Sequence, residues 1–269
     1  MSAVPGSSKL EVRSLAKVFE TRHEKMTALD GATLRVEDNE FVSLVGTSGC
    51  GKSTLLSIVA GLQQATSGEV LVSGHPVVGP GRDRGVVPQS DTLFPWLNAR
   101  QNVEFALRGE KMSKAQRRAT AIEQLRLVGL EDFVEASPKQ LSGGMRQRVA
   151  IARALSYKPE ILLMDEPFGA LDALTRQVMQ ELLTLVWERH RLTVLFVTHD
   201  VQEAVYISDR VLVMTNRPGR IKKDVKVDLP RPRRHEMFSS PEFRALQAEV
   251  FESIREESLQ VEKVADVLE

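Results

Sequence analysis

The chain has 269 residues, of which 42% are hydrophobic and 27% are charged. This composition excludes a wholly disordered protein and allows one large domain or two small ones. Its 36 basic residues balance its 36 acidic residues, which disfavours a dedicated nucleic-acid-binding protein. The single cysteine, Cys50, excludes an intrachain disulfide framework and a cysteine-cluster metal site. No apolar stretch approaches the roughly 20 residues of a membrane span, and residues 1–8 lack a signal-peptide pattern, so we expect a soluble, cytoplasmic protein.

The first part of the chain predicts strands followed by a glycine-rich loop and a helix. Residues 10–19 and 32–36 alternate in part between apolar and polar side chains, and 41–45 is a valine-rich run typical of a buried strand. Apolar residues at helical spacing then predict a helix over 52–62. Beyond it, a small antiparallel element is predicted over residues 69–73 and 77–78.

The middle of the chain alternates predicted helices and strands. Helical patterns cover residues 102–133 and 140–156. A basic cluster at 111–118 fits either a nucleic-acid contact or, as we favour, a solvated helix face. Two apolar runs predict central parallel strands with a helix between them, at residues 161–164, 174–188 and 194–197. This alternation predicts a βαβ architecture.

The C-terminal part predicts a hairpin, a linker and a helix. Residues 211–214 and 221–227 flank a turn that contains Pro218, and a proline-rich linker follows. Ser239 and Glu242 form a capping-box pattern ahead of apolar residues at helical spacing. We therefore expect a C-terminal helix that docks on the main body.

The strongest chemical signal is the sequence GTSGCGKS at residues 46–53, which fits the phosphate-loop pattern and has a strand before it and a helix after it. Its glycines let the backbone wrap around phosphates, and the loop N–H groups and helix N-terminus favour an anion. Lys52 can neutralise the β- and γ-phosphates, and the Ser53 hydroxyl can bind Mg²⁺. The expected nucleotide contacts here are Gly46, Thr47, Ser48, Gly49, Cys50, Gly51, Lys52, Ser53 and Thr54.

Cys50 allows two interpretations within this loop. The neighbouring helix N-terminus and Lys52 favour the reactive thiolate, in which case a bulky thiol reagent would block the phosphates. Alternatively, Cys50 is a small side chain whose only role is to fit the loop.

Two further motifs are consistent with nucleotide chemistry. The apolar run before Asp165 and Glu166 predicts carboxylates at the carboxyl edge of a parallel sheet, where Asp165 can hold Mg²⁺ and Glu166 can polarise water. Ser142, Gly143 and Gly144 predict a capped helix start whose N–H groups suit a second anion. Because the chain already has one phosphate loop, this second site is expected to serve a nucleotide on another copy.

These three motifs, in this order, resemble the ATPase subunits of ATP-binding cassette transporters over about residues 10–227. The resemblance assigns Gln89 to the family's glutamine loop and Asp172 to its aspartate loop. It makes His199 the switch histidine and Phe19 the aromatic residue that stacks on adenine. Alone, Gln89 also fits a surface residue, His199 a satisfied strand-end histidine and Phe19 a core aromatic.

The resemblance also implies a fold, a domain organisation and a set of roles. The implied fold is an α/β P-loop NTPase (RecA-like) core with an antiparallel β subdomain and an inserted α-helical subdomain. The expected divisions are a flexible N-terminus over residues 1–9, a nucleotide-binding domain over 10–228 with its helical subdomain at about 90–157, and a linker with a helical extension over 229–269. The cofactors are ATP and Mg²⁺. The implied catalytic residues are Glu166, His199 and Gln89; the metal ligands are Ser53, Gln89 and Asp165; and ATP also contacts Phe19, Ser142, Gly143, Gly144 and Asp172.

A narrower likeness concerns residues 93–97, LFPWL, and the tail from residue 229 to the helix after Pro241. Both are similar to the nitrate, sulfonate and taurine importer group. Phe94 and Trp96 either fill a core or, as we favour, form part of an apolar groove for a helix of the membrane subunit.

The leading functional hypothesis is therefore an ATPase that energises uptake of a small solute, such as a nitrate-, sulfonate- or taurine-like anion. Its expected partners are a second ATPase subunit, integral-membrane permease subunits and, indirectly, a solute-binding receptor, but no nucleic acid. We expect it at the cytoplasmic face of the inner membrane. The alternative is a soluble ATPase of the same family acting on nucleic acid or the ribosome. A phosphate-loop kinase leaves Ser142 and His199 unexplained, and Glu166 argues against a regulator without turnover.

Overall fold

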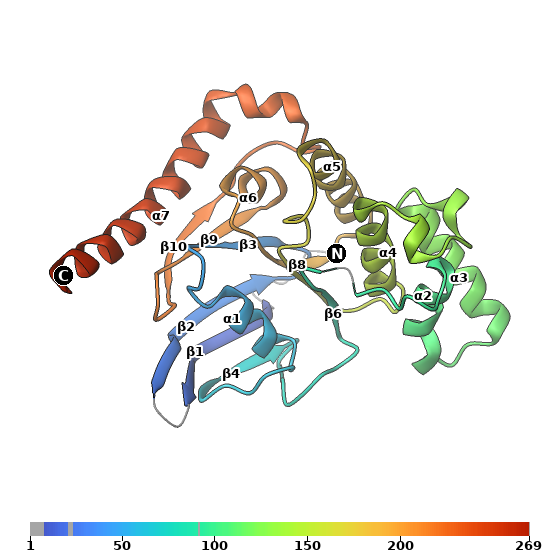
Figure 1. Ribbon diagram of the computed structural model, residues 1–269, viewed down its shortest axis with the longest axis horizontal. Coiled ribbons are helices and arrows are strands. Elements are labelled where there is room, and N and C mark those ends of the chain that lie inside the picture. The colour runs from blue at the N-terminus through green and yellow to red at the C-terminus, as the bar shows by residue number, and fades with distance from the viewer. Residues whose placement is uncertain (1–7, 21–23, 91, 269) are drawn as a thin grey trace, which may run out of the picture. The chain divides into compact units, whose positions relative to one another are not determined.

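The computed structural model describes residues 8–20, 24–90 and 92–268, without the side chains of residue 258 and residues 260–268. Its helices and strands are labelled in Figure 1, and its contacts divide the chain into two compact units. The first comprises Met1–Gly81 and Arg191–Glu269, and the second comprises Arg82–His190. Most of the N-terminus that was expected to be flexible lies outside the described residues, and Ser8 and Lys9 already belong to a strand.

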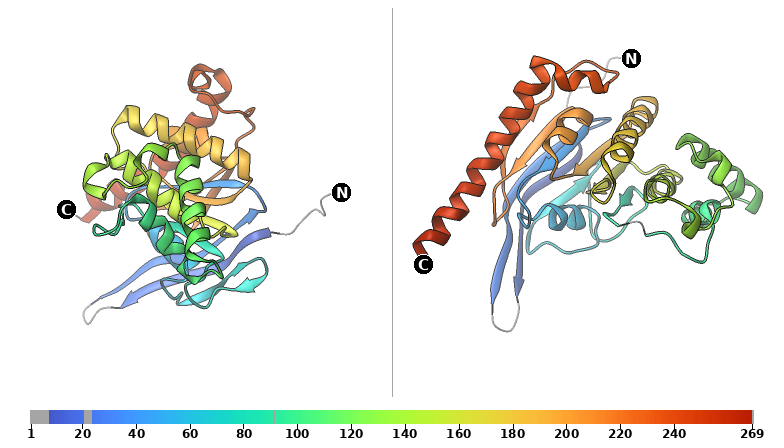
Figure 2. Two further views of the ribbon diagram at one scale, coloured as in Figure 1. Left: turned by 90° about the vertical axis from the view of Figure 1, so that its right-hand side faces the viewer. Right: turned by 45° about the horizontal axis from the view of Figure 1, so that its top comes forward.

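An antiparallel sheet forms one part of the first unit. Its strands follow the order β2-β1-β4-β5. Their bounds are Ser8–Glu20 for β1, Lys25–Glu37 for β2, Ser67–Val72 for β4 and His75–Pro76 for β5. Strands β1 and β2 run side by side as a long hairpin (Figure 2), with Leu10 opposite Val36 and Phe19 opposite Met26. Pairing with β1 extends β2 well beyond the predicted 32–36.

A second set of strands in the first unit surrounds β3, Phe41–Val45. Strands β8, Thr193–Val197, and β9, Arg210–Met214, flank β3 in parallel, and β10, Ile221–Lys226, pairs antiparallel with β9. All five residues of β3 are buried, as the valine-rich run predicts. The α/β architecture expected from the alternation of strands and helices is present.

Two short helices of the first unit pack on these strands. Helix α1, Lys52–Val59, contacts β8 and β2. It ends before the predicted Leu62, because the Leu62 N–H bonds to the carbonyl of Ser57, five residues back, and closes the helix. Helix α6, Val201–Ile207, was not predicted. It begins where the Asp200 carboxylate accepts the N–H of Glu203, and it packs on β3 and β9.

The C-terminal helix α7, Pro241–Leu268, packs on α6, β9 and β10 within the first unit. Phe243 and Val250 are buried in this contact. The predicted capping box at Ser239 is wrong: the Ser240 hydroxyl accepts the N–H of Phe243 at 3.1 Å. Pro241 occupies the first helical position. An N–H at this position would have no intrahelical acceptor, so proline loses no helical hydrogen bond there. The predicted docking of a C-terminal helix is confirmed.

Among its described residues, the second unit combines two parallel strands with four α-helices. Its strands are β6, Arg84–Val87, and β7, Ile161–Asp165. Its helices are α2, Ala99–Ala106, α3, Lys114–Leu127, α4, Gly143–Leu155, and α5, Ala173–His190. Single-turn helices occur at Leu107–Gly109, Glu131–Phe133 and Pro138–Gln140, and another in the first unit covers His235–Ser239.

The continuous helical pattern predicted over residues 102–133 is in fact divided between α2 and α3. Asn98 caps α2 and Ser113 caps α3, each in a capping box with the glutamine three residues later. Asn98 lies ahead of the predicted stretch, whereas Ser113 lies within it, at the break between the two helices. Strand β6 was not predicted, because its four residues begin with an arginine and include a glycine.

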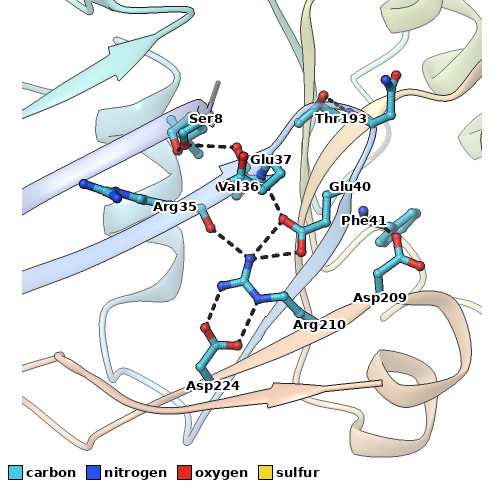
Figure 3. A network of polar contacts seen from close by, with 12 residues as sticks. Ser8, Arg35, Val36, Glu37, Glu40, Phe41, Thr193, Asp209, Arg210 and Asp224 are labelled. Carbon is cyan, nitrogen blue, oxygen red and sulfur yellow. Dashed lines mark hydrogen bonds and ion pairs between the residues drawn. The ribbon is translucent and has the colours of Figure 1, made fainter. Parts of the chain in front are cut away.

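Arg210 ties together four segments of the first unit (Figure 3). On β9, its guanidinium donates to both carboxylate oxygens of Glu40, at 3.0 and 2.9 Å, and to the carbonyl of Arg35, at 3.2 Å. Its other nitrogens donate to Asp224 on β10 at 3.0 and 2.6 Å. The hydrogen bonds that Arg210 donates to the carboxylates of Asp224 and Glu40 outweigh the cost of burial and raise the pKa of Arg210. One side chain thus joins β9 to β10, to the residue before β3 and to β2.

Replacing Arg210 with alanine should lower the free energy of unfolding by about 2–3 kcal/mol, because Glu40, whose side chain is 13% exposed, loses its charged partner. Urea denaturation measures this. The matched control is Arg13→Ala, since Arg13 also bridges two carboxylates, Glu11 and Glu69, but is half exposed. A smaller loss is expected for the control. Equal losses would contradict the special role of Arg210.

Candidate functional site

The phosphate loop of the first unit follows directly from the carboxyl end of β3. Gly51 has a φ of 108°, and a Cβ atom there would lie 2.8 Å from the Leu29 side chain, so only glycine fits this turn. Helix α1 begins at the next residue, and its first intrahelical bond runs from the Leu55 N–H to the Gly51 carbonyl at 2.9 Å. The N–H groups of residues 52–54 precede that bond, an arrangement that favours an anion at the loop.

Lys52 lies across the loop and is almost completely buried. Its ammonium donates to the carbonyl of Gly46 at 2.9 Å and to that of Thr47 at 3.0 Å. A positive charge is therefore held within the turn itself, at the place where a bound phosphate chain would need it.

Cys50 fills the inside of the loop. Its side chain is fully buried, and a Cβ atom placed on Gly46 would lie 2.9 Å from its Sγ. Burial raises the pKa of the Cys50 thiol, and this effect exceeds the opposing influence of the Lys52 charge. The interpretation as a reactive thiolate is thus wrong, and the alternative of a small side chain that fits the loop agrees with the structure.

The other two expected site residues of the first unit are partly or fully exposed. His199 follows β8 and is exposed, next to the Asp200 that caps α6. Phe19 on β1 is partly exposed, and the Lys17 ammonium lies 5.1 Å from the centre of its ring. Such a distance is typical of a cation–π contact. Lys17 therefore interacts with one face of the Phe19 ring, the ring that is expected to stack on adenine.

In the second unit, Asp165, Glu166 and Gln89 lie at or just after the carboxyl ends of two parallel strands, at the same edge of the sheet. Strands β6 and β7 are parallel, with Val87 opposite Met164, so Gln89 emerges at the edge where Asp165 and Glu166 emerge. Glu166 has a φ of 42°, a left-handed conformation that is rare for a side-chain-bearing residue. The backbone turn behind it is closed by a bond from the Gly169 N–H to the Glu166 carbonyl at 3.1 Å. Strained backbone of this kind occurs often at functional positions.

The start of α4 and the start of α5 meet in the second unit. Ser142 caps α4, as predicted, by accepting the N–H of Met145 at 3.2 Å. A Cβ atom on Gly144 would lie 2.5 Å from the Thr175 side chain, so glycine permits this close approach. Asp172 accepts the N–H of Thr175 at 3.0 Å, and this hydrogen bond keeps the pKa of Asp172 below its usual value. Ser142 and Asp172 are both exposed beside this contact.

The expected site residues thus fall into two groups, one in each unit. The phosphate loop, His199 and Phe19 belong to the first unit, and the remaining expected residues belong to the second. Sequence reasoning missed Thr175, which joins the Ser142 and Asp172 segments. It also missed Arg217, whose guanidinium donates to the Gly49 carbonyl of the phosphate loop. Neither has a recognisable motif, because each contact joins residues far apart in the sequence.

A surface cluster of aromatic rings lies in the second unit, formed by Phe94, Trp96 and Phe105. The ring centre of Phe94 is 5.4 Å from that of Trp96 and 4.5 Å from that of Phe105. Trp96 is 74% exposed and Phe105 is 40% exposed. The interpretation of Trp96 as a core residue is therefore wrong. Exposed clusters of large apolar side chains usually mark interaction surfaces.

Comparisons with known proteins agree with these features. The sequence profile of the family described as ABC transporter matches residues 29–169. A putative ATP-binding protein of Brucella abortus is 54% identical over 242 residues, which cover 90% of this chain and 93% of that protein. The nitrate import ATP-binding protein NrtD of Synechocystis is 46% identical over 252 residues, covering 91% and 95% of the two chains. The bicarbonate transport ATP-binding protein CmpD of Synechococcus elongatus is 44% identical over 238 residues, covering 87% and 86%.

A solved structure extends the likeness to the fold. The dimeric post-hydrolysis structure of the ATP-binding cassette MJ0796, bound to ADP and Pi, matches with a TM-score of 0.72 and 36% identity. The match covers 82% of this chain and 100% of the other. The predicted fold, an α/β phosphate-loop core with an antiparallel β subdomain and a helical subdomain, is confirmed. This chain accordingly belongs to the ABC transporter family, in which it is an ATPase that couples ATP hydrolysis to transport.

Proposed function

We propose that this chain energises import of a small anion through a separate membrane permease. The observation that carries the proposal is the phosphate loop at the end of β3, with Lys52 held across its carbonyls. Two relatives bear the names of nitrate import and bicarbonate transport proteins, which supports a small oxyanion as the solute. A nitrate-, sulfonate- or taurine-like anion remains our proposal for its class.

The proposed ATP site assigns one task to each group. Residues 46–54 surround the phosphates with N–H groups, and the Lys52 ammonium neutralises the β- and γ-phosphates. Mg²⁺ supplies further neutralisation when it is bound, and the oxygen atoms of Ser53, Gln89 and Asp165 suit such a hard cation. Phe19 stacks on adenine.

In the proposed hydrolysis step, Glu166 acts as general base and takes a proton from the attacking water. His199 holds the γ-phosphate and keeps that water in line. Gln89 follows the same sheet edge as Glu166, which suits a residue that contacts both metal and water.

In this proposal, a second copy of the chain completes each nucleotide site. Ser142 and Asp172 are exposed at helix starts, and together with Gly143 and Gly144 they would bind the nucleotide held by another chain. The solved relatives are dimeric cassettes, which supports a homodimer with two composite sites.

The permease is proposed to dock on the surface cluster of Phe94, Trp96 and Phe105. Among the described residues, no helix is both long enough and apolar enough to cross a bilayer. The names of the importer relatives support assigning the membrane path to other chains and this chain to the cytoplasmic face of the membrane, with a solute-binding receptor acting through the permease.

In a complex reconstituted with permease and receptor, the correct anion should stimulate ATP turnover. Glu166→Gln should keep ATP binding but slow turnover by roughly 10²–10⁴, the usual contribution of a general base. Phosphate release with nitrate, bicarbonate and taurine, each tested separately, measures both effects. The matched control is Glu160→Gln, which makes the same change just before the opposite end of β7. Wild-type turnover in Glu166→Gln would assign the base to another residue.

Mixing two impaired variants, Ser142→Ala and Lys52→Ala, tests the composite sites. Ser142→Ala should reduce turnover without weakening ATP binding by one chain, and Lys52→Ala should abolish that binding. In a mixed dimer, one site carries both lesions and the other carries none, so partial activity should return. Steady-state ATPase rates across mixing ratios measure it, with each variant alone as control. Activity that never exceeds that of the single variants would exclude two independent composite sites.

Alanine variants of the two tryptophans distinguish a role in permease docking from a role in folding. Trp96→Ala should leave the melting temperature nearly unchanged but weaken co-purification with the permease, because a large exposed aromatic often dominates an interface. Trp187, which is 2% exposed on α5, is the control: its truncation should cost about 3–5 kcal/mol of stability. Undiminished co-purification of Trp96→Ala would remove Trp96 from the interface.

A further inference from the structure

The C-terminal helix α7 carries a buried carboxylate that is directed at the turn between β9 and β10. Glu257 is 6% exposed, and its Oε2 accepts the backbone N–H of Asn216 at 3.0 Å. Its Oε1 lies 2.7 Å from the ammonium of Lys222 on β10. Lys222 also donates to the Ser253 carbonyl at 3.0 Å and to Glu256 at 2.8 Å. The helix is thus bonded to both the turn and the strand that follows it.

The same turn contacts the phosphate loop from its outer side. The carboxamide oxygen of Asn216 accepts the N–H of Arg217 at 2.8 Å. The Arg217 guanidinium then donates through Nε and Nη2 to the Gly49 carbonyl, at 3.3 and 3.1 Å. Its third nitrogen lies 2.9 Å from the sulfur of Met26, whose backbone is paired with that of Phe19. Arg217 therefore joins the phosphate loop to the strand pair that carries the expected adenine contact.

The turn is held on its far side as well. The N–H of Gly219 donates to the Ala28 carbonyl at 2.9 Å, and its carbonyl accepts the N–H of Asp30 at 3.2 Å. With β2 on one side and Glu257 on the other, the segment from Asn216 to Gly219 has little freedom to move. A guanidinium on such a segment can hold a neighbouring loop in place.

We propose that Arg217 and Glu257 are positioning residues for the phosphate loop, through which α7 supports ATP binding. A phosphate loop binds its ligand through N–H groups, so the peptide unit between Gly49 and Cys50 has to keep its orientation. Gly49 has a φ of 76°, and Arg217 bonds the carbonyl of this peptide unit. Glu257 acts one step further away, by holding the turn that presents Arg217.

A purely structural role for these residues makes a different prediction. Helix α7 already buries Phe243 and Val250 against the first unit, so its docking does not depend on Glu257 alone. If the contacts only stabilise the fold, their loss should lower the melting temperature and leave the ATP affinity of the folded chain unchanged. If they position the loop, the ATP dissociation constant and KM should rise while kcat changes little.

The experiment measures the dissociation constant of a fluorescent ATP analogue, with ATPase KM and kcat, on the purified full chain. Arg217→Ala should weaken binding about tenfold, the equivalent of one charge-assisted hydrogen bond. Arg217 is exposed, so this variant should fold normally. Glu257→Ala should weaken binding in the same direction, by about threefold. Glu257→Gln should restore binding, because its amide oxygen can still accept the Asn216 N–H.

The control is Glu256→Ala, which removes a carboxylate from the same lysine but from an exposed residue with no bond to the turn. Its ATP affinity should equal that of the wild type. The double variant Arg217→Ala/Glu257→Ala should bind no more weakly than Arg217→Ala, since both residues act through one contact. Unchanged affinity in Arg217→Ala, or equal losses in Glu257→Ala and Glu256→Ala, would overturn the proposal. Wild-type binding in the same assay tests the ATP site independently.

Discussion

The complete burial of β3 is the constraint on which the first unit depends. A strand buried on both faces must pair its backbone groups on both sides, and β3 does so in parallel with β8 and β9. The chain therefore leaves the sheet at Val45 and turns at once into α1, which packs back on β8. A glycine-rich loop connects the two, and the N–H groups of residues 52–54 at the start of α1 precede its first intrahelical bond. Arg210 supports this arrangement because, from β9, it bonds both to Glu40 just before β3 and to Asp224 on β10.

The phosphate loop is held from several directions, each by a different kind of interaction. Lys52 crosses it and bonds two carbonyls, Cys50 fills its interior, and Arg217 bonds the Gly49 carbonyl from outside. Hydrophobic packing sets the position of Cys50, whereas charge-assisted hydrogen bonds set the other two. An arrangement held in this way before the ligand arrives loses little conformational entropy on binding. This preorganisation suits a site that must bind ATP in every cycle.

The second unit holds residues proposed for hydrolysis and a surface proposed for docking. Parallel pairing of β6 and β7 directs Gln89 and Glu166 to one edge, and the contact of Gly144 with Thr175 joins the starts of α4 and α5. The cluster of Phe94, Trp96 and Phe105 lies in the same unit as Gln89, in the sequence that follows it. A permease docked on that cluster would therefore act close in sequence to a residue proposed to contact the metal. This closeness suggests how transport and hydrolysis are coupled.

The sequence by itself determined the parts that depend on local patterns. The phosphate loop, the buried β3 and β7, the Ser142 cap and the docked C-terminal helix follow from residue spacing and apolar periodicity. Where a short element has no clear periodicity, as in α6 and β6, only packing against neighbouring strands decided its structure. Burial of Cys50 and exposure of Trp96 likewise depend on what the folded chain places around them. The bond from Arg217 to Gly49 joins positions 168 residues apart, and that of Glu257 to Asn216 joins positions 41 apart. No local pattern encodes such contacts, because they exist only once strands and helices from distant segments have packed together.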